Sequence, residues 1–260
     1  MADAGAPRID VRLATQERGT VATVTVDNRR KLNTLNSALM RDFIAQVEAL
    51  AAREDLRALV LTGAGEAAFI GGASIDEMAT LDPTNAERFI TLVHRTCDCL
   101  RRLPVPVIAR IDGYALGAGL EVAVSCDLRV ATTRAMFGMP EVKVGLPSVV
   151  EAALIPGLIG WGRARELQLT GETIDSDTAL RWGLVEHVVK PEDLDGEVDR
   201  IVGALLSAGP LAVRSQKRLM QEWEKLPTDR AIEAGIDALV RAFDTDEPRR
   251  LMSAFLNRKR

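Results

Sequence analysis

The order of strand-like and helix-like segments along the chain is the feature that most constrains its fold. Four segments favour strands: residues 21–26, 58–62, 106–111 and 128–131. Between them, residues 37–53 have the spacing of an amphipathic helix, and residues 119–126 are apolar enough to form a buried one. This βαβ rhythm predicts an α/β fold in which helices cover the sheet.

The rhythm stops near residue 190. Pro191 and the acidic residues after it stand where a helix would start, and from there to residue 260 the sequence has only helical periodicity. We therefore predict a strand-containing core over residues 1–190 and a helical region over residues 191–260. We find no internal repeat and no low-complexity segment.

Charge and hydropathy favour a cytoplasmic protein that binds neither nucleic acid nor a membrane. The 37 acidic and 33 basic residues give a net charge of −4, which creates no field for a polyanion. No apolar run approaches the roughly 20 residues of a membrane helix, and residues 1–12 lack the apolar stretch of a signal peptide. Cys97, Cys99 and Cys126 lack zinc-ligand spacing and are expected to be buried, reduced thiols.

Histidine usage argues against two common kinds of active site. The chain has only His94 and His187, and neither lies in a nucleophile motif with serine or cysteine. Two histidines without an H-E-x-x-H motif are also poor material for a catalytic metal, so we predict no metal site. Both histidines are expected to have structural roles.

The first glycine-rich turn follows the strand at 58–62. Residues 63–68 match G-x-G-x-x-A, but a second small-residue turn, 69–74, follows before a helix begins, which disfavours a dinucleotide-binding fingerprint. A loop with such small side chains lets a ligand reach backbone N–H groups. Taken alone, these residues are better explained by an ordinary strand-to-helix turn.

Two glutamates follow the second glycine-rich turn, at 113–119. Glu121 lies near the start of an apolar helix, where it either complements the helix dipole or is buried for a functional reason. A buried carboxylate costs several kcal/mol unless it is protonated or paired. Glu141 follows 20 residues later, after Pro140. If the two carboxylates meet in one pocket, they are the parts needed for general acid and general base catalysis.

Taken in order, these segments resemble the enoyl-CoA hydratase/isomerase (crotonase) family over almost the whole chain. The matching segments are residues 30–35, 68–75, 113–121, 126–127, 137–141, 179–185 and 252–255. The resemblance implies an α/β fold with a crotonase-like spiral of ββα units and a C-terminal helical trimerisation region. It also implies a homo-oligomer, either a trimer or a dimer of trimers.

The resemblance further implies an enoyl-CoA hydratase that adds water reversibly to a short or branched 2-enoyl-CoA. Glu121 would act mainly on the water and Glu141 mainly on the proton at Cα. The backbone N–H groups of Ala73 and Ala118 would form the oxyanion hole for the thioester oxygen. The acyl-CoA thioester is the expected partner, and no cofactor is implied because coenzyme A is part of the substrate.

The sequence departs from the family pattern at several positions. Ala118 replaces a frequent glycine, which leaves its backbone N–H available, and Ser74 stands where aspartate is usual. The loop at 147–152 carries valines and Glu151 in place of glycines, which should narrow the acyl pocket. Glu151 is either a third functional carboxylate or a helix N-terminal residue. Expected substrate-binding residues are Lys31, Leu32, Ser74, Ile75, Asp76, Ser148, Glu151 and Phe255.

Other functions remain as alternatives. On the same fold, these are an enoyl-CoA isomerase or a carnitinyl-CoA-type dehydratase. From a different class, the chain would be a non-catalytic acyl-CoA or RNA-binding relative. Retention of Glu121 and Glu141 argues against a dead enzyme, and the acidic isoelectric point of about 5.4 argues against general RNA binding.

Overall fold

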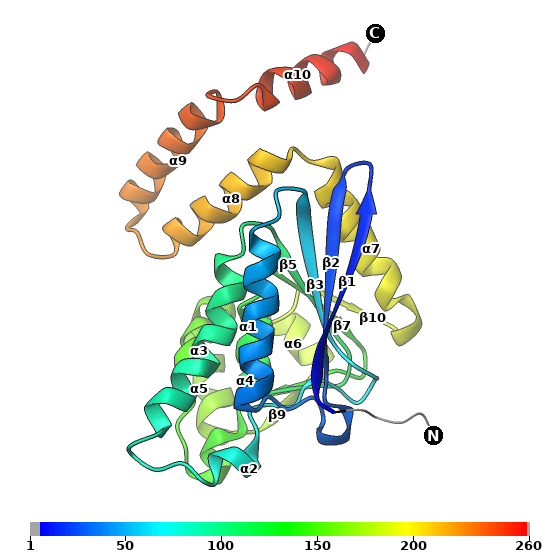
Figure 1. Ribbon diagram of the computed structural model, residues 1–260. Coiled ribbons are helices and arrows are strands. Elements are labelled where there is room, and N and C mark those ends of the chain that lie inside the picture. The colour runs from blue at the N-terminus through cyan, green and yellow to red at the C-terminus, as the bar shows by residue number, and fades with distance from the viewer. Residues whose placement is uncertain (1–5, 259–260) are drawn as a thin grey trace.

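Two sheets and a surrounding set of helices make up the fold (Figure 1). The computed structural model describes residues 6–258. A six-stranded sheet has the order β1-β2-β3-β5-β7-β10, and a four-stranded sheet has the order β4-β6-β8-β9. The strands are β1 (Arg8–Gln16), β2 (Gly19–Asp27), β3 (Leu56–Gly63), β4 (Ala68–Ile70), β5 (Val107–Ile111), β6 (Tyr114–Leu116), β7 (Leu128–Thr132), β8 (Met136–Gly138), β9 (Thr173–Asp175) and β10 (His187–Val189).

The helices follow the strands in a repeating order. The α-helices are α1 (Ser37–Ala51), α2 (Ile75–Met78), α3 (Ala86–Arg102), α4 (Ala118–Val124), α5 (Ile155–Thr170), α6 (Ser176–Trp182), α7 (Leu194–Ser207), α8 (Pro210–Trp223), α9 (Thr228–Ala242) and α10 (Glu247–Arg258). Four 3-10 helices are η1 (Arg29–Lys31), η2 (Pro140–Val144), η3 (Val150–Leu154) and η4 (Pro191–Asp193).

From β3 to β8, consecutive strands alternate between the two sheets, which gives the spiral of ββα units. The chain passes from β3 to β4, from β5 to β6 and from β7 to β8, and helical structure follows each pair. Within the sheets, β3, β5 and β7 pair in parallel, as do β4, β6 and β8. The predicted α/β spiral is therefore confirmed.

The predicted elements with strong periodicity are all present. The four predicted strands correspond to β2, β3, β5 and β7, and the two predicted helices correspond to α1 and α4. The edge strand β1 was not predicted because most of its side chains are exposed and give no buried alternation. The strands of the smaller sheet have three residues each, which is too short for a period to emerge.

Helices cover both faces of the larger sheet. Helices α1 and α3 pack against each other over the main apolar cluster, which includes Met40, Phe43 and Leu100. On the other face, α7 buries Leu194 and Ile201 in a second cluster with side chains of β3, β5 and β7. Described residues after 189 form only helices, turns and loops, so the predicted change at residue 190 coincides with the end of β10. Because α7 packs on the sheet, it belongs structurally to the core.

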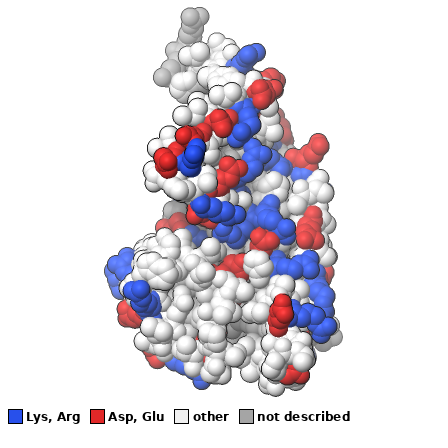
Figure 2. Space-filling view, turned by 90° about the vertical axis from the view of Figure 1, so that its left-hand side faces the viewer, with Lys and Arg blue, Asp and Glu red and all other residues white. Residues whose placement is uncertain are grey.

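The helices α8, α9 and α10 form an arm that leads away from the sheets (Figure 1). Figure 2 shows this arm from the side, separated from the body by a notch, with charged side chains gathered along it and a largely uncharged surface below. The division into a core and an oligomerisation region stays a prediction. Within residues 6–258, no helix has the length and apolar character needed to cross a membrane.

Buried Lys217 anchors α8 to the core. Its Nζ donates to the carbonyl oxygens of Leu100 and Val105 at 3.2 and 2.9 Å, and pairs with Asp127 Oδ2 at 2.7 Å. These partners stabilise a side chain that burial would otherwise disfavour in its charged form. The arm therefore starts from a fixed point on the core.

Lys217→Met tests this anchor. The change removes one buried donor from two carbonyl oxygens and the countercharge of the Asp127 carboxylate, so we expect the free energy of unfolding to fall by about 3 kcal/mol. Denaturant unfolding measures it, with the exposed Lys225→Met as the control. Equal stability of the two variants would contradict the anchoring role.

Candidate active site

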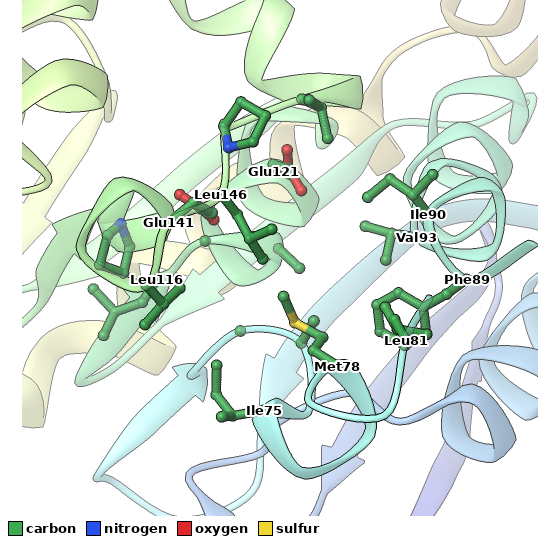
Figure 3. Close-up of a pocket in the computed structure, with 18 of the residues that line it drawn as sticks. Ile75, Met78, Leu81, Phe89, Ile90, Val93, Leu116, Glu121, Glu141 and Leu146 are labelled. Carbon is green, nitrogen blue, oxygen red and sulfur yellow. The ribbon is translucent and has the colours of Figure 1, made fainter. Parts of the chain in front are cut away.

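A pocket of about 430 Å³ opens where the ends of β4, β6 and β8 meet α2 and α3. One wall is apolar and consists of Met78, Leu81, Phe89, Ile90 and Val93 (Figure 3). The facing side carries the backbone at 71–73 and 117–118 together with two glutamates. The pocket thus combines an apolar chamber with a small polar centre.

Glu121 reaches the pocket from α4, a short helix whose residues are all buried. The helix can approach β4 closely because residue 119 is glycine: a Cβ there would lie 1.9 Å from the carbonyl oxygen of Ile70. Glu121 is 4% exposed, and its Oε1 accepts a hydrogen bond from the Ala152 N–H at 3.2 Å. The sequence-based expectation of a buried carboxylate is confirmed.

Glu141 enters the same pocket from η2. The Ser148 hydroxyl donates to its Oε2 at 2.8 Å, which fixes the orientation of the carboxylate. Gly117, at φ +52°, leaves room for the other oxygen, because a Cβ there would lie 2.5 Å from Glu141 Oε1. The structure therefore brings together the two glutamates that the sequence singled out.

Burial disfavours the charged form of Glu121. Burial, together with the nearby charges of Glu141 and Glu151, raises the pKa of Glu121 to about 8, although the Ala152 N–H opposes this shift. Near neutral pH Glu121 therefore retains its proton, so the pocket holds a carboxyl group that can act as an acid beside a second glutamate.

Two backbone amides face the pocket beside the glutamates. Ala73 follows Gly72, whose φ of +120° turns the chain, and pairs with Leu35 in a short bridge. Ala118 is the first residue of α4 and lines the pocket with Ala73. Among the hydrogen bonds of residues 6–258, neither of these amides has an acceptor. They are therefore available to a ligand oxygen, as the oxyanion-hole prediction requires.

The other predicted binding residues have different surroundings. Ile75 lines the pocket. The next residue, Asp76, pairs with the exposed Lys31. Leu32 and Ser74 hold the loops together through their backbones, with Gly71 N–H donating to Leu32 O and Ser74 N–H donating to Leu35 O. Phe255 lies on α10 in the arm and does not line the pocket of its own chain.

Glu151 lies behind the pocket wall. It does not line the pocket; it is buried and pairs through Oε1 with His94 Nδ1 at 2.7 Å. Burial raises the pKa of Glu151, and His94 opposes this effect. The sequence did not indicate this pairing, because the two residues are 57 positions apart.

The apolar wall was also missed. Phe89, Ile90 and Val93 have the spacing of one helix face on α3, but the sequence does not distinguish a face that lines a pocket from one that packs in the core. Cys97, Cys99 and Cys126 are buried free thiols, as predicted. In the described part of the chain, no group of three or more His, Cys, Asp or Glu residues is placed to hold a metal ion.

The fold and the site define an acid–base enzyme. A carboxylate pair beside free backbone donors is suited to a substrate that develops negative charge on a carbonyl oxygen. The sequence model described as enoyl-CoA hydratase/isomerase matches residues 16–260. The chain belongs to the enoyl-CoA hydratase/isomerase family, and the family's crotonase fold is the one observed here.

Individual relatives agree over nearly the whole length. A short-chain-enoyl-CoA hydratase of Clostridium acetobutylicum is 34% identical over 94% of each chain. A crotonyl-CoA hydratase of Syntrophomonas wolfei is 35% identical, over 92% of this chain and 93% of its own. The crystal structure of an enoyl-CoA hydratase from Bacillus anthracis superposes with a TM-score of 0.91 at 30% identity and covers 96% of both chains.

The raised pKa of Glu121 predicts a stability change in Glu121→Gln. Between the ordinary value of 4.5 and about 8, native Glu121 holds a proton that the unfolded chain has released, so the wild type loses stability as pH rises. A glutamine does not titrate. We expect the variant to match the wild type near pH 5 and to exceed it at pH 9 by about 2 kcal/mol or more, or roughly 4 °C in melting temperature.

Thermal unfolding measured from pH 5 to pH 9 checks this expectation. Glu172→Gln, an exposed carboxylate outside the pocket, is the matched control and should show no such divergence. A Glu121→Gln curve parallel to the wild type at every pH would show that Glu121 is ionised in the folded protein throughout.

Proposed function

We propose that this protein is an enoyl-CoA hydratase that adds water reversibly across the 2,3 double bond of a short or branched 2-enoyl-CoA. The observation that carries the proposal is the position of Glu121 and Glu141 in one pocket beside the free amides of Ala73 and Ala118. Membership of the enoyl-CoA hydratase/isomerase family and the relatives' hydratase activity support the same reaction.

The thioester oxygen would accept hydrogen bonds from the Ala73 and Ala118 amides. When water adds to Cβ, the electrons of the double bond move onto this oxygen as an enolate, and fixed donors stabilise that charge without reorganising. Because both donors belong to the backbone, alanine at 118 preserves the interaction. The amides thus make Cβ more susceptible to attack.

The glutamate pair would handle the water and its proton. Glu121 acts mainly on the water, whose oxygen bonds to Cβ, and Glu141 mainly delivers a proton to Cα. The pair accepts one proton from the water and gives one to Cα, so its protonation is the same before and after the reaction. Because Glu121 retains a proton near neutral pH in the free protein, these roles require that proton to pass to Glu141 when the substrate and water bind.

Two functional carboxylates favour hydration over isomerisation. An enoyl-CoA isomerase moves a proton and adds nothing, so one carboxylate is enough for it. Here both carboxylates are oriented by hydrogen bonds, Glu141 by Ser148 and Glu121 by Ala152. An arrangement that holds two carboxylates supports the reaction that needs a bound water.

The walls of the pocket indicate the kind of acyl group. Apolar side chains surround the space beyond the glutamates, and Val149 from the loop at 147–152 adds to them. This environment favours an uncharged hydrocarbon chain, and the bulk of the valine favours a short or branched one. Coenzyme A is part of the substrate, so the proposed chemistry requires no metal or redox cofactor.

The arm supports a homo-oligomer, which we propose to be a trimer or a dimer of trimers in the cytoplasm. Helices α9 and α10 expose many large apolar side chains: Ile232, Ile236, Leu239, Val240, Phe243, Leu251, Met252, Phe255 and Leu256. A patch of this kind marks an association surface. Association would also let Phe255 approach the CoA site of a neighbouring copy, since it does not line its own pocket.

Crotonyl-CoA hydration tests the proposed reaction. Purified protein should remove the absorbance of the conjugated thioester, and Glu121→Gln and Glu141→Gln should each lower kcat by about a hundredfold or more, the effect of losing a positioned acid or base. Their KM values should change little, because the pocket wall and CoA contacts remain.

The exposed Glu172→Gln serves as the control and should retain full activity. If the wild-type protein binds crotonyl-CoA without hydrating it and acts instead on a 3-enoyl-CoA, the proposed reaction is wrong and the protein is an isomerase. Loss of binding to all CoA thioesters would overturn the substrate class.

The oligomer is tested by charging α9. The wild type should have three or six times the mass of one chain by light scattering after size exclusion, whereas Ile236→Glu/Leu239→Glu should have a lower mass because the charges cannot be buried. Leu13→Glu, at an exposed leucine on β1, is the control. A monomeric wild type, or a double variant with wild-type mass, would contradict association through α9.

A further inference from the structure

The turn at residues 148–152 touches both glutamates. The Ser148 hydroxyl donates to Glu141, and the Ala152 N–H donates to Glu121. Val149, between them, lines the pocket. The conformation of this one turn therefore decides where both carboxylates point.

Val150 holds the turn in an unfavourable backbone conformation. Its φ of +44° lies in the left-handed region, which is rare for a β-branched residue and usually occupied by glycine. Such a residue keeps this conformation only when its surroundings impose it. An interaction elsewhere in the turn must therefore hold it in place.

Glu151 provides that interaction. Its side chain is 7% exposed and bonds to His94 on α3, whose ring is 48% exposed. This bond attaches the turn to the helix behind the pocket wall, and it is shorter than the 3.3 Å contact of Gln168 Nε2 with the Ala152 carbonyl oxygen of the same turn. The neighbour Val93 on the same helix lines the pocket, so α3 supports both the wall and the turn.

We infer that Glu151 and His94 are positioning residues for the hydration reaction: their pair holds the turn at 148–152 in the conformation that orients Glu121 and Glu141. This inference rests on the proposed function. Neither residue would touch the substrate. Their contribution would be to keep the two carboxylates at a fixed separation and angle around the water.

Other titratable groups lie near the pair and the pocket. On α3, Cys97 and Asp98 lie one turn beyond His94; Cys97 also hydrogen-bonds to Glu151, and Asp98 is paired with Arg102 at 2.8 Å. The titratable groups that line the pocket are Glu121, Glu141, Lys143 and Glu87. His94 Nδ1 makes the 2.7 Å contact with Glu151 Oε1, so removal of the ring takes this hydrogen bond away from the carboxylate.

Two substitutions at His94 separate positioning from general stability. The ring is half exposed, so the fold should tolerate both changes. His94→Phe keeps a ring but removes the donor, and His94→Asn places an amide donor near the position of Nδ1. We expect His94→Phe to lower kcat at least tenfold with KM within about twofold, and His94→Asn to restore kcat to within about threefold of the wild type.

Arg95→Phe is the matched control, because it puts the same side chain at the next, exposed position of α3. It should retain wild-type kcat. Wild-type kcat in His94→Phe would overturn the inference. Equal losses of kcat in His94→Phe and His94→Asn would also overturn it, because restoring a hydrogen-bond donor would then have no effect.

A second readout does not depend on catalysis. The difference in stability between the wild type and Glu121→Gln grows with pH and becomes constant above the pH where native Glu121 ionises. This plateau begins at about pH 8 for the wild type. The Ala152 hydrogen bond lowers the pKa of Glu121, so losing that bond raises the pKa. The effect of the bond is larger than the opposite effect of the Glu151 charge. In the His94→Phe background, the pH at which the plateau begins should rise by about half a pH unit or more. In the His94→Asn background, this pH should stay the same.

The two readouts distinguish the two proposals. If wild-type protein does not hydrate crotonyl-CoA but the plateau shifts as expected, the hydratase proposal fails while the turn still positions Glu121. If hydration is normal and neither kcat nor the plateau responds to His94→Phe, the positioning role fails and the hydratase proposal stands.

Discussion

Burial of the Glu121 carboxylate is the constraint on which the site depends. The charge is disfavoured in an apolar helix, and a second carboxylate in the same pocket disfavours it further. The Ala152 N–H is the only hydrogen-bond donor that the described residues give to this carboxylate, so it offsets only part of the effect. Glu121 therefore retains a proton near neutral pH, and this difference in environment is what makes two chemically identical side chains suitable for complementary roles.

The spiral topology brings the polar centre together. Parallel pairing of β4 with β6 and of β6 with β8 aligns the ends of these strands, so the segments that follow them meet at one edge. These segments carry Ala73, Ala118 and Glu141. Close contact then requires glycine where a Cβ would strike a neighbour, as at Gly117 and Gly119. Strands of three residues are sufficient, because the site depends only on where these strands end.

The sequence predicted those parts of the site that depend on local chemistry. A lone glutamate in an apolar helix and another after proline indicated Glu121 and Glu141, and the glycine turns indicated available backbone amides. The apolar wall on α3 and the Glu151–His94 pair depend on contacts between distant segments, so no local pattern contained them. The fold was predictable to the same extent. Long elements such as β3 and α1 leave a periodic pattern in the sequence, whereas three-residue strands do not.

Val150 and Glu151 determine how the turn is stabilised. A glycine turn adopts a left-handed backbone without strain but leaves the turn free to move, whereas valine at φ +44° costs about 1–3 kcal/mol. A hydrogen bond to a carboxylate, such as the one between His94 and Glu151, contributes about 1.5–3 kcal/mol. The two quantities are of similar size. The pair can therefore hold the strained turn, and a rigid turn keeps both carboxylates oriented while the valines narrow the pocket.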